Sequence, residues 1–370
     1  MQPRYVYGRT ALRERFLLDP TVTYLNHGSF GATPRPVFET YQRWQLELER
    51  EPVEFIVRRL PDLLAEARAA LGAFVGAAAD DLTFVPNAGT GVNVAARAIG
   101  LREGDEVLTT DLEYGACNYA WEWVCARAGA RYVRAPHDEL FEHATERTRV
   151  LYLSHITSET GLLLPVEETL ARGRELGLVT VVDGAHAPAH VPLDLDALGA
   201  DFYAGNCHKW LCAPKGAGFL HVRPEWQERV DGPIVSWGYG DEASFLTRTE
   251  EQGTRDSAAY LSVPAAIEFV RAHDEPERCV ALCREARRAL NTLLGAEPIA
   301  PESMVLRMAS VRVPDARAVQ RALFDEHRIE IPAMRDDLLR LSVAMYTTRE
   351  DVERLLDALP AVLSPSRSPA

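Results

Sequence analysis

The chain has 370 residues, of which 47% are hydrophobic and 25% are charged, and its formal net charge is -14 at pH 7. This composition is typical of a globular protein, and the length allows a large domain with a smaller companion domain. The excess of negative charge disfavours nucleic acid as the main partner, because a polyanion would on average be repelled.

The N-terminal segment is polar, reading MQPRYVYGRTALRERF, and lacks the charged, apolar and small-residue order of a signal peptide. No apolar run approaches the roughly 20 residues that span a bilayer. The six cysteines are Cys117, Cys125, Cys207, Cys212, Cys279 and Cys283. They do not combine with histidines at the spacing of a zinc site, so we expect reduced thiols and no metal site. These features predict a cytoplasmic protein that does not bind a membrane.

The hydrophobic periodicity predicts a helical segment from Pro34 to Leu71, interrupted near Pro52 and Pro61. Short β-rich runs then alternate with amphipathic helical segments such as Pro165 to Leu176. The seven predicted strands are LTFVP, EVLTT, ARYVRA, RVLYLSH, VTVVD, DFYAGN and GAGFLHV. This alternation predicts an α/β fold with a mostly parallel sheet and helices on both faces.

A smaller α/β domain is predicted to begin near Ser262 with a long helix. It would contain strands within Met304 to Val313 and within LLRLSVA, and a closing helix from Arg349. The last residues, SPSRSPA, predict a frayed tail.

We therefore predict three parts of the chain. They are an N-terminal arm at residues 1–23, a large domain at 24–261 and a small C-terminal domain at 262–370.

The first candidate site follows the strand LTFV, since ligand groups in parallel sheets gather where strands end and helices begin. Pro86 to Asn93 reads P-N-A-G-T-G-V-N. Small residues with a threonine at a helix start can bind phosphate through backbone N–H groups and a hydroxyl. The segment lacks the P-loop lysine and the full dinucleotide glycine pattern. An ordinary helix start would also account for it.

Asp183 and His186 belong to V-V-D-G-A-H, directly after an all-apolar strand. A carboxylate there is costly unless it is paired. Pyridoxal phosphate (PLP) supplies a suitable partner, because a carboxylate keeps its pyridine nitrogen protonated. The alternative is that Asp183 caps the next helix, where Asp followed by Gly is common.

His208, Lys209 and Trp210 lie in N-C-H-K-W, after the strand DFYAGN. A partly desolvated lysine at a strand end suits Schiff-base chemistry, because its amine must be unprotonated to act as a nucleophile. The alternative is a surface lysine at a turn. The position of Lys209, one α/β step after Asp183, favours the first interpretation.

Arg340 enters the apolar strand R-L-S-V-A-M-Y. An arginine there can bind a substrate carboxylate through two parallel hydrogen bonds, although an ion pair at a strand edge is the alternative. Together the four patterns supply a lysine, a partner for the pyridine nitrogen, a phosphate site and a carboxylate site, which is a consistent PLP site.

Nearly the whole chain resembles the class V aminotransferase family of fold-type I PLP enzymes, which also includes cysteine desulfurases. The closest similarity is to the isopenicillin N epimerase-like branch. The motifs that carry it are Y-L-N-H-G-S-F-G (Tyr24 to Gly31), D-G-A-H, H-K-W, V-S-W-G-Y and R-L-S-V-A-M-Y. The resemblance implies a fold-type I structure, PLP as cofactor, an amino acid substrate and a homodimer.

The resemblance also implies roles for residues around the cofactor. Lys209 would bind PLP as a Schiff base and move the α-proton, Asp183 would pair with the pyridine nitrogen, and His186 would approach the phenolic oxygen. The residues expected to bind phosphate are Ala88, Gly89, Thr90 and His208, together with Gly253-Thr254 from the neighbouring subunit.

The remaining roles concern the ring and the substrate. Ser158 in H-I-T-S-E-T-G matches a position near the cofactor ring that usually carries an asparagine. Arg340 matches the arginine that binds the substrate carboxylate. Asn26 and His27 resemble a loop that lines the substrate side.

The chain departs from the family at two places. Desulfurases carry a mobile cysteine where this chain reads R-I-E-I-P-A-M-R-D-D, which disfavours desulfurase activity. The residue that stacks on the ring is commonly histidine, whereas L-E-Y-G-A offers Tyr114. Tyr114 is also a candidate proton donor opposite Lys209, although its ordinary pKa near 10 makes it a poor acid.

We therefore expect an epimerase or aminotransferase acting at the α-carbon of an amino acid. The alternatives are a carbon–sulfur β-lyase, a cysteine desulfurase-like enzyme and, more distantly, a PLP-binding protein without catalytic activity. The incomplete glycine pattern disfavours a nucleotide-binding oxidoreductase.

Overall fold

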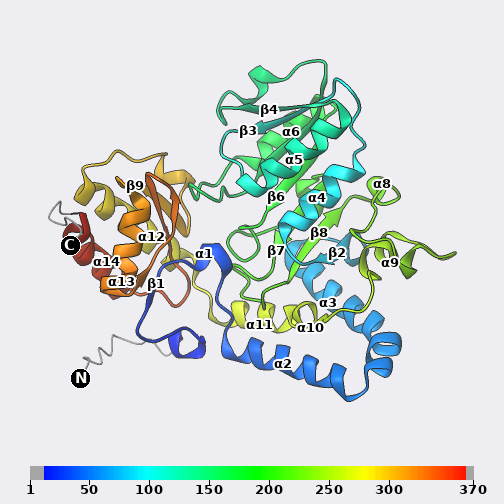
Figure 1. Ribbon diagram of the computed structural model, residues 1–370, viewed down its shortest axis with the longest axis horizontal. Helices are drawn as coiled ribbons and strands as arrows, with labels where there is room; N and C mark the ends of the chain where they lie inside the picture. The colour runs from blue at the N-terminus through cyan, green and yellow to red at the C-terminus, as the bar shows by residue number, and fades with distance from the viewer. Residues whose placement is uncertain (1–11, 364–370) are drawn as a thin grey trace. The chain divides into compact units, whose positions relative to one another are not determined.

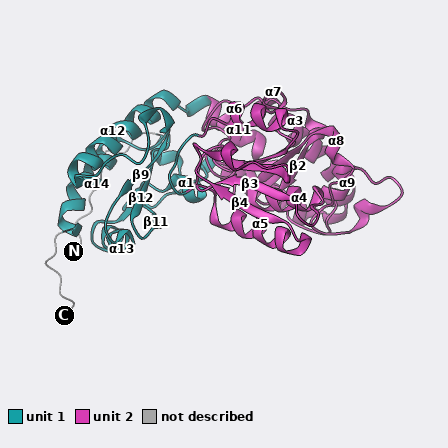
Figure 2. Ribbon diagram, turned by 90° about the horizontal axis from the view of Figure 1, so that it is seen from above, with its two compact units in different colours: residues 1–35, 159–163, 272–370 teal, residues 36–158, 164–271 magenta. Residues whose placement is uncertain are grey.

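The computed structural model describes residues 12–363. The predicted frayed tail and the first part of the predicted N-terminal arm lie outside the described residues. The chain divides into two compact units (Figure 2). Of the described residues, unit 1 contains 12–35, 159–163 and 272–363, and unit 2 contains 36–158 and 164–271.

Unit 2 is built on a seven-stranded sheet (Figure 1). Its strands are β2 Leu82–Val85, β3 Glu106–Thr110, β4 Arg131–Ala135, β5 Thr148–Ser154, β6 Val179–Gly184, β7 Phe202–Asn206 and β8 Gly218–Val222. Their spatial order is β2-β8-β7-β6-β5-β3-β4. Only β8 runs antiparallel to its neighbours in this sheet, and the other pairs are parallel. The predicted seven-stranded, mostly parallel sheet is confirmed.

The helices of this part of the chain follow the predicted alternation. They are α2 Arg35–Arg50, α3 Leu60–Val75, α4 Ala88–Ala98, α5 Gly115–Ala128, α6 Val166–Glu175, α7 Leu195–Leu198, α8 Pro224–Gln227, α9 Phe245–Glu250, α10 Ala258–Leu261 and α11 Val263–His273. The predicted interruption near Pro52 is confirmed, and a π-helical segment, Glu54–Arg59, follows it. At Pro61 the helical stretch does not break: residues 52–75 are helical throughout, and Pro61 lies just after the π-helical segment, so the second predicted interruption is a change of helix type only.

Successive side chains of a strand point to opposite faces of the sheet, and helices cover both faces. Val181 of β6 packs in one hydrophobic cluster with Val92 of α4 and Trp121 of α5. Thr180 points to the opposite face, where a Cβ on Gly173 of α6 would lie 3.4 Å from its Cγ2 atom. The predicted two-faced covering is confirmed.

Unit 1 contains an antiparallel sheet with the order β11-β12-β9. Its strands are β9 Met308–Arg312, β11 Ala333–Arg335 and β12 Leu338–Ser342, and a separate parallel pair joins β1 Thr23–Tyr24 to β10 Ile329–Glu330. Its helices are α1 His27–Phe30, α12 Pro276–Leu294, α13 Ala316–His327 and α14 Arg349–Leu363. The predicted strands and closing helix of the C-terminal part are present.

The compact units group three short segments differently from the predicted domains. Residues 24–35 and 159–163, predicted in the large domain, belong to unit 1, and residues 262–271, predicted in the small domain, belong to unit 2. Long-range pairing is the physical reason: Thr23 pairs with Ile329, and Leu162 forms an isolated bridge with Val305. The domain boundaries stay a prediction, since contacts within one chain do not define domains. None of the helices in the described part of the chain has the length and apolar composition needed to cross a membrane.

Candidate active site

Asp183 is the penultimate residue of β6 and is 4% exposed. It continues the alternation of Val181 and therefore faces α4 and α5. Its Oδ1 atom accepts the N–H of Ala185 at 2.9 Å, and the thiol of Cys117 on α5 donates to Oδ2 at 3.5 Å. Burial raises the pKa of Asp183, while the Ala185 N–H and the positive charge of Lys209 act against that rise. These hydrogen bonds hold the carboxyl group in place, and a cation beside it stabilises its ionised form.

Lys209 and His186 are brought together by the ends of the adjacent parallel strands β6 and β7. The Nζ atom of Lys209 lies 3.1 Å from Nε2 of His186, and Nε1 of Trp210 donates to Nδ1 of His186 at 3.4 Å. An indole N–H can only donate, so in a neutral His186 the ring proton belongs on Nε2. That N–H then points toward Nζ of Lys209, the atom that would act as the nucleophile.

The ring of His190, which was not among the residues predicted from the sequence, supports this arrangement. Its centroid lies 4.2 Å from that of Trp210, and its Nδ1 atom lies 3.1 Å from the carbonyl oxygen of His186. The motif A-P-A-H after D-G-A-H was the available signal.

The start of α4 is fixed by two asparagines. Oδ1 of Asn206, at the end of β7, accepts the N–H of Ala88 at 2.8 Å, and Oδ1 of Asn87 accepts the N–H of Thr90 at 2.9 Å. The first N–H groups of a helix have no partner within it. Of the three residues predicted to bind phosphate here, Gly89 is therefore the one whose N–H has no such acceptor among the described residues.

A glycine brings this helix close to the sheet. A Cβ atom on Gly91 would lie 2.8 Å from Cβ of Ala204 in β7. Only glycine therefore allows α4 to pack at this distance, which places its N-terminus beside the end of β7.

His208 directly precedes Lys209, and its Nδ1–H donates to the carbonyl of Ala217 at 2.8 Å. Burial lowers the pKa of His208 to about 4, so the ring is neutral at pH 7 and Nε2 is an acceptor. For Nε2 of His208 to donate a hydrogen bond to a phosphate, the ring would need a second proton. The negative charge of a phosphate would stabilise that protonated ring. The role of His208 stays a prediction.

Glu113, which was not among the residues predicted from the sequence, is a second buried carboxyl group at this edge. It is 3% exposed, and burial raises its pKa to about 7. Oγ1 of Thr110 donates to Oε1 at 2.6 Å, and Oγ of Ser154 lies 2.5 Å from Oε2. An acid between the strand EVLTT and Tyr114 was the available signal.

Tyr114 and Ser158 lie on connections that leave the same edge of the sheet. Tyr114 precedes α5 and is 45% exposed, and its carbonyl oxygen accepts the N–H groups of Cys117 and Asn118. Ser158 is buried in the connection after β5. The predicted roles of both residues near the cofactor ring stay predictions.

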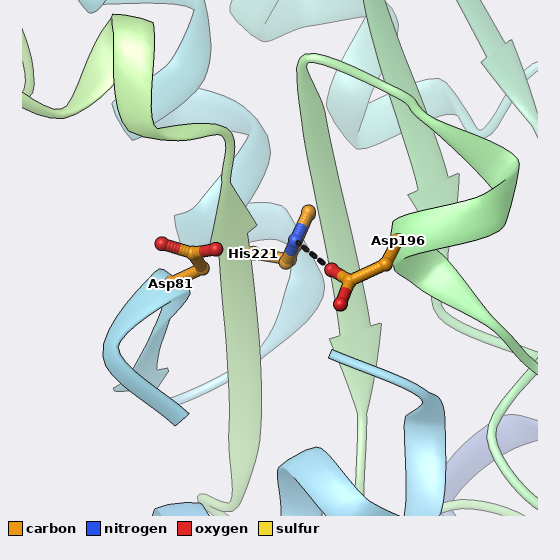
Figure 3. A group of neighbouring side chains, drawn as sticks. All are labelled: Asp81, Asp196 and His221. Atoms are coloured by element: carbon orange, nitrogen blue, oxygen red, sulfur yellow. Dashed lines mark ion pairs between the residues drawn. The ribbon is translucent and has the colours of Figure 1, made fainter. Parts of the chain in front are cut away.

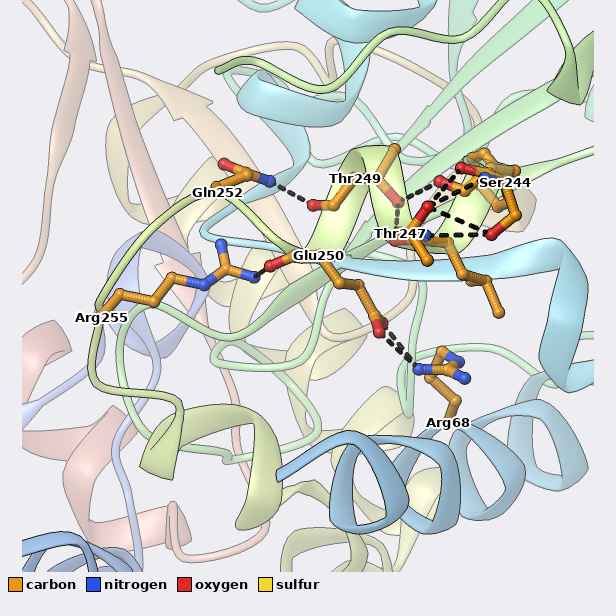
Figure 4. Close-up of polar contacts among 9 residues, drawn as sticks. Arg68, Ser244, Thr247, Thr249, Glu250, Gln252 and Arg255 are labelled. Carbon is orange, nitrogen blue, oxygen red and sulfur yellow. Dashed lines mark hydrogen bonds and ion pairs between the residues drawn. The ribbon is translucent and has the colours of Figure 1, made fainter. Parts of the chain in front are cut away.

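Thr254 is exposed in the connection that follows α9, next to Gly253 with φ of 94°. Both sides of this connection are anchored (Figure 4). Nη1 of Arg68 lies 2.7 Å from Oε2 of Glu250 in a nearly buried ion pair, and Nη2 of Arg255 donates to the Glu250 carbonyl at 3.1 Å. Thr254 is thus presented at the surface by a fixed frame.

Unit 1 brings the predicted substrate-binding residues of two distant segments together. Arg340 of β12 is 1% exposed, and its Nη2 atom donates to Oγ of Ser29 at 2.8 Å. Nδ1 of His27 lies 3.0 Å from the hydroxyl of Tyr346. Asn26 donates from Nδ2 to Oε1 of Glu330 at 3.0 Å.

A separate polar group lies at the amino edge of the large sheet, opposite the candidate site (Figure 3). His221 pairs with Tyr203 near the start of β7, and its Nε2 atom lies 3.7 Å from Oδ1 of Asp196. Asp81 offers an oxygen within 4.8 Å of both and accepts a hydrogen bond from Gln227 at 2.6 Å. Burial lowers the pKa of His221, so we interpret this group as a neutral imidazole beside two hydrated carboxylates.

The sequence model of the family "Aminotransferase class-V" matches residues 33–297. The chain therefore belongs to the class V aminotransferase family. It is 39% identical to isopenicillin N epimerase of Amycolatopsis lactamdurans over 385 residues, which cover 94% of this chain and 96% of that protein. L-Cysteine desulfhydrases and cysteine desulfurases are also similar to it, at lower identity.

Solved structures give the same fold. A C-DES mutant with glycine covalently linked to its PLP cofactor matches with a TM-score of 0.84 and 26% identity, over 95% of this chain and 99% of that chain. The cystine C–S lyase C-DES bound to its product cysteine persulfide matches with a TM-score of 0.82 and 26% identity, over 91% and 97% of the two chains. The predicted fold-type I structure is confirmed, and the family and these neighbours are PLP-dependent enzymes.

Proposed function

We propose that this protein is a PLP-dependent enzyme that acts at the α-carbon of an amino acid, as an epimerase or aminotransferase of the isopenicillin N epimerase type. The observation that carries the proposal is the pair of Lys209 and His186, with Nζ 3.1 Å from Nε2, beside the buried carboxyl group of Asp183. The 39% identity to an isopenicillin N epimerase over 94% of this chain supports the type of reaction.

The side chains of unit 2 fit PLP. Lys209 would hold the cofactor covalently through Nζ. Asp183 would pair with the pyridine nitrogen, because a buried carboxyl group with a raised pKa is stabilised as a carboxylate by an adjacent cation. Phosphate would lie at the start of α4, near the N–H of Gly89 and the hydroxyl of Thr90. When bound, PLP withdraws electrons from the α-carbon of an attached amino acid and so makes its hydrogen acidic.

The residues around Lys209 then decide where a proton goes. Nζ of Lys209 would accept the α-proton, and His186, held by the indole N–H of Trp210, would keep that amine oriented. Return of the proton on the opposite face gives epimerisation, and we propose Tyr114 as its donor. Delivery of the proton to the cofactor carbon instead would give transamination.

The test is α-proton exchange in deuterated water with a panel of L- and D-amino acids and purified protein supplied with PLP. Deuterium at the α-carbon with inverted configuration supports epimerisation, and a keto acid supports transamination. Absence of exchange with every member of the panel would contradict the proposal.

A carbon–sulfur β-lyase is the second candidate, because the cystine C–S lyase C-DES has the same fold at 26% identity. Release of pyruvate from cysteine or cystine would favour it. A desulfurase-like reaction is disfavoured, since all six cysteines are buried and the segment around β10 and β11 contains none. A protein that binds PLP but exchanges no α-proton would be a non-catalytic member of the family.

Arg340 is expected to bind the α-carboxylate of the substrate. Replacing Arg340 with lysine removes the planar pair of N–H donors, so we expect KM for the amino acid to rise about tenfold or more with a smaller change in kcat. Steady-state kinetics would measure this. Arg312→Lys is the matched control, because Arg312 lies on the neighbouring strand β9 with a side chain that is 62% exposed. An unchanged KM in Arg340→Lys would remove Arg340 from the substrate site.

A homodimer is also proposed, with Thr254 completing the phosphate site of the neighbouring subunit. The segment between β8 and α9 supports it, because Ile234, Val235 and Trp237 are 54%, 75% and 89% exposed in the single chain. Contiguous exposed apolar side chains of this kind mark protein interfaces.

Trp237→Ser is expected to raise the dimer dissociation constant about tenfold or more, since buried tryptophans contribute strongly to interfaces. Sedimentation over a range of concentrations would measure the shift. Trp123→Ser is the control, because Trp123 on α5 is also exposed, at 52%. A monomeric wild-type protein that still turns over substrate would contradict the dimer.

A further inference from the structure

Glu113 is a buried acid to which the proposed reaction assigns no task. It lies between β3 and α5, and its carboxyl group contacts the hydroxyls of Thr110, the last residue of β3, and Ser154, the last residue of β5. These two strands are neighbours in the sheet. Ser154 is in turn the register partner of Asp183 in β6. Glu113 therefore joins two strand ends directly beside the carboxyl group expected to face the cofactor.

The groups that act on the pKa of Glu113 are two hydroxyls, a backbone N–H and a second acid. The titratable neighbours of Glu113 are Cys117 on α5, Tyr132 on β4, Tyr152 on β5 and Asp183 on β6. Each of these groups is neutral or negative. The positive charge of Arg134 acts on Tyr132, whose pKa it lowers. Among the described residues, no lysine or arginine forms an ion pair with Glu113. Burial raises the pKa of Glu113 most, and the charge of Asp183 adds to that rise. Hydrogen bonds from the Ser154 hydroxyl, the Thr110 hydroxyl and the Ser154 backbone N–H act against it and leave a pKa of about 7.

The hydrogen bonds indicate where a proton would lie. Oγ1 of Thr110 accepts the N–H of Leu112 at 3.2 Å, so its own hydrogen is available for Oε1 of Glu113. Oγ of Ser154 donates to Oε2 at 2.5 Å, and a proton on Oε2 would reverse this contact, with the carboxyl O–H donating to the hydroxyl oxygen. One proton on Oε2 is therefore compatible with both contacts.

We propose that Glu113 is a positioning residue that carries a proton in the mildly acidic range up to neutral pH, ties the end of β3 to the end of β5, and leaves Asp183 as the single carboxylate beside the pyridine nitrogen. The part that concerns the cofactor rests on the proposed function. The protonation itself is a property of the chain and can be tested without PLP.

Infrared spectroscopy of the apo-protein tests the protonation. At about pH 6, below the raised pKa of Glu113, the wild type should show the C=O band of a buried protonated carboxyl group. The band should vanish in Glu113→Gln and persist in Glu122→Gln, which alters an exposed acid on α5. It should also persist in Asp183→Asn, because Asp183 is the proposed carboxylate. Absence of the band from the wild type, or its loss only in Asp183→Asn, would overturn the proposal.

Cofactor affinity tests the positioning role. Glutamine reproduces a neutral acid, so Glu113→Gln should bind PLP within about threefold of the wild type, whereas Glu113→Ala should bind about tenfold more weakly because two hydroxyls lose their partner. Equally weak binding by both variants would show that a negative charge is required and would overturn the proposal. Failure of the wild type to bind PLP would contradict the proposed function instead, and the infrared result would still decide the state of Glu113.

Unfolding of the apo-protein gives a third readout. The folded pKa of Glu113, about 7, is above its ordinary value of 4.5, so ionisation opposes folding as pH rises between these values. The unfolding equilibrium constant should gain a factor of about two orders of magnitude across this window, and Glu113→Gln should lack that factor. Equal pH dependence in the wild type and Glu113→Gln, measured by urea denaturation, would contradict a buried, titrating Glu113.

Discussion

Replacing Lys209 with alanine is expected to abolish covalent attachment of PLP and to lower α-proton exchange by about four orders of magnitude. The physical reason is that Nζ of Lys209 has two proposed tasks, holding the cofactor and accepting the α-proton, and alanine can do neither. The visible absorbance band of the protein with PLP should disappear, and amino acid turnover should be lost with it.

The chain allows a sharp version of this test, because it contains two lysines, Lys209 and Lys215. Both lie near the end of β7, and Lys215 is exposed on the connection to β8. Lys215→Ala is thus the matched control and should keep the absorbance band. Borohydride reduction followed by peptide mass spectrometry should place the cofactor on Lys209. A cofactor found on Lys215, or on neither lysine, would contradict the central assignment.

Asp183→Asn is expected to separate activity from stability. An amide cannot keep the pyridine nitrogen protonated, so α-proton exchange should fall by about two to three orders of magnitude. The apo-protein should be no less stable, because burial raises the folded pKa of Asp183 and its ionised form therefore opposes folding.

The sign of the pH dependence follows from that rise. Above the ordinary pKa of an aspartate the unfolded wild type gains from ionising Asp183 while the folded chain resists that ionisation, and the asparagine variant has no such difference. The stability difference in favour of Asp183→Asn should therefore increase from acidic to neutral pH. Urea denaturation of the apo-proteins at several pH values would measure it.

Asp201→Asn is the opposite control. Asp201 lies at the amino edge of the same sheet, where Oδ2 accepts the N–H of Thr180 at 2.7 Å and Oδ1 accepts the indole N–H of Trp226 at 3.0 Å. Turning an acceptor into a donor there should lower the free energy of unfolding by about 1–3 kcal/mol, with little effect on the chemical step.

If Asp183→Asn exchanged the α-proton at the wild-type rate, Asp183 would not be the partner of the pyridine nitrogen.

Much of the fold could be predicted from local patterns. The seven strands of unit 2 are short β-rich runs bounded by polar or glycine-containing segments, and each lies where its run predicted. Asp183 and Lys209 could be singled out for the same reason, because each follows a strand whose apolar composition is visible in the sequence. The resemblance to class V aminotransferases then supplied roles that the residues alone left open.

The site's contacts could not be predicted in this way. The 3.1 Å separation of Lys209 and His186 depends on the register of β6 against β7, and the thiol of Cys117 reaches Asp183 only because α5 covers that face. Glu113 looked like an ordinary acid in a loop, since its burial comes from strand ends that are distant in sequence.

The sequence by itself determined the order of the elements and the residues placed at the strand ends, because those features depend on local composition and periodicity. The tertiary structure decided which of these residues meet. Thr23 pairs with Ile329, Ser29 contacts Arg340, and Glu113 joins Thr110 to Ser154. Such contacts, and the charge states that burial imposes on them, arise from pairing and packing across the chain, on which local patterns carry no information.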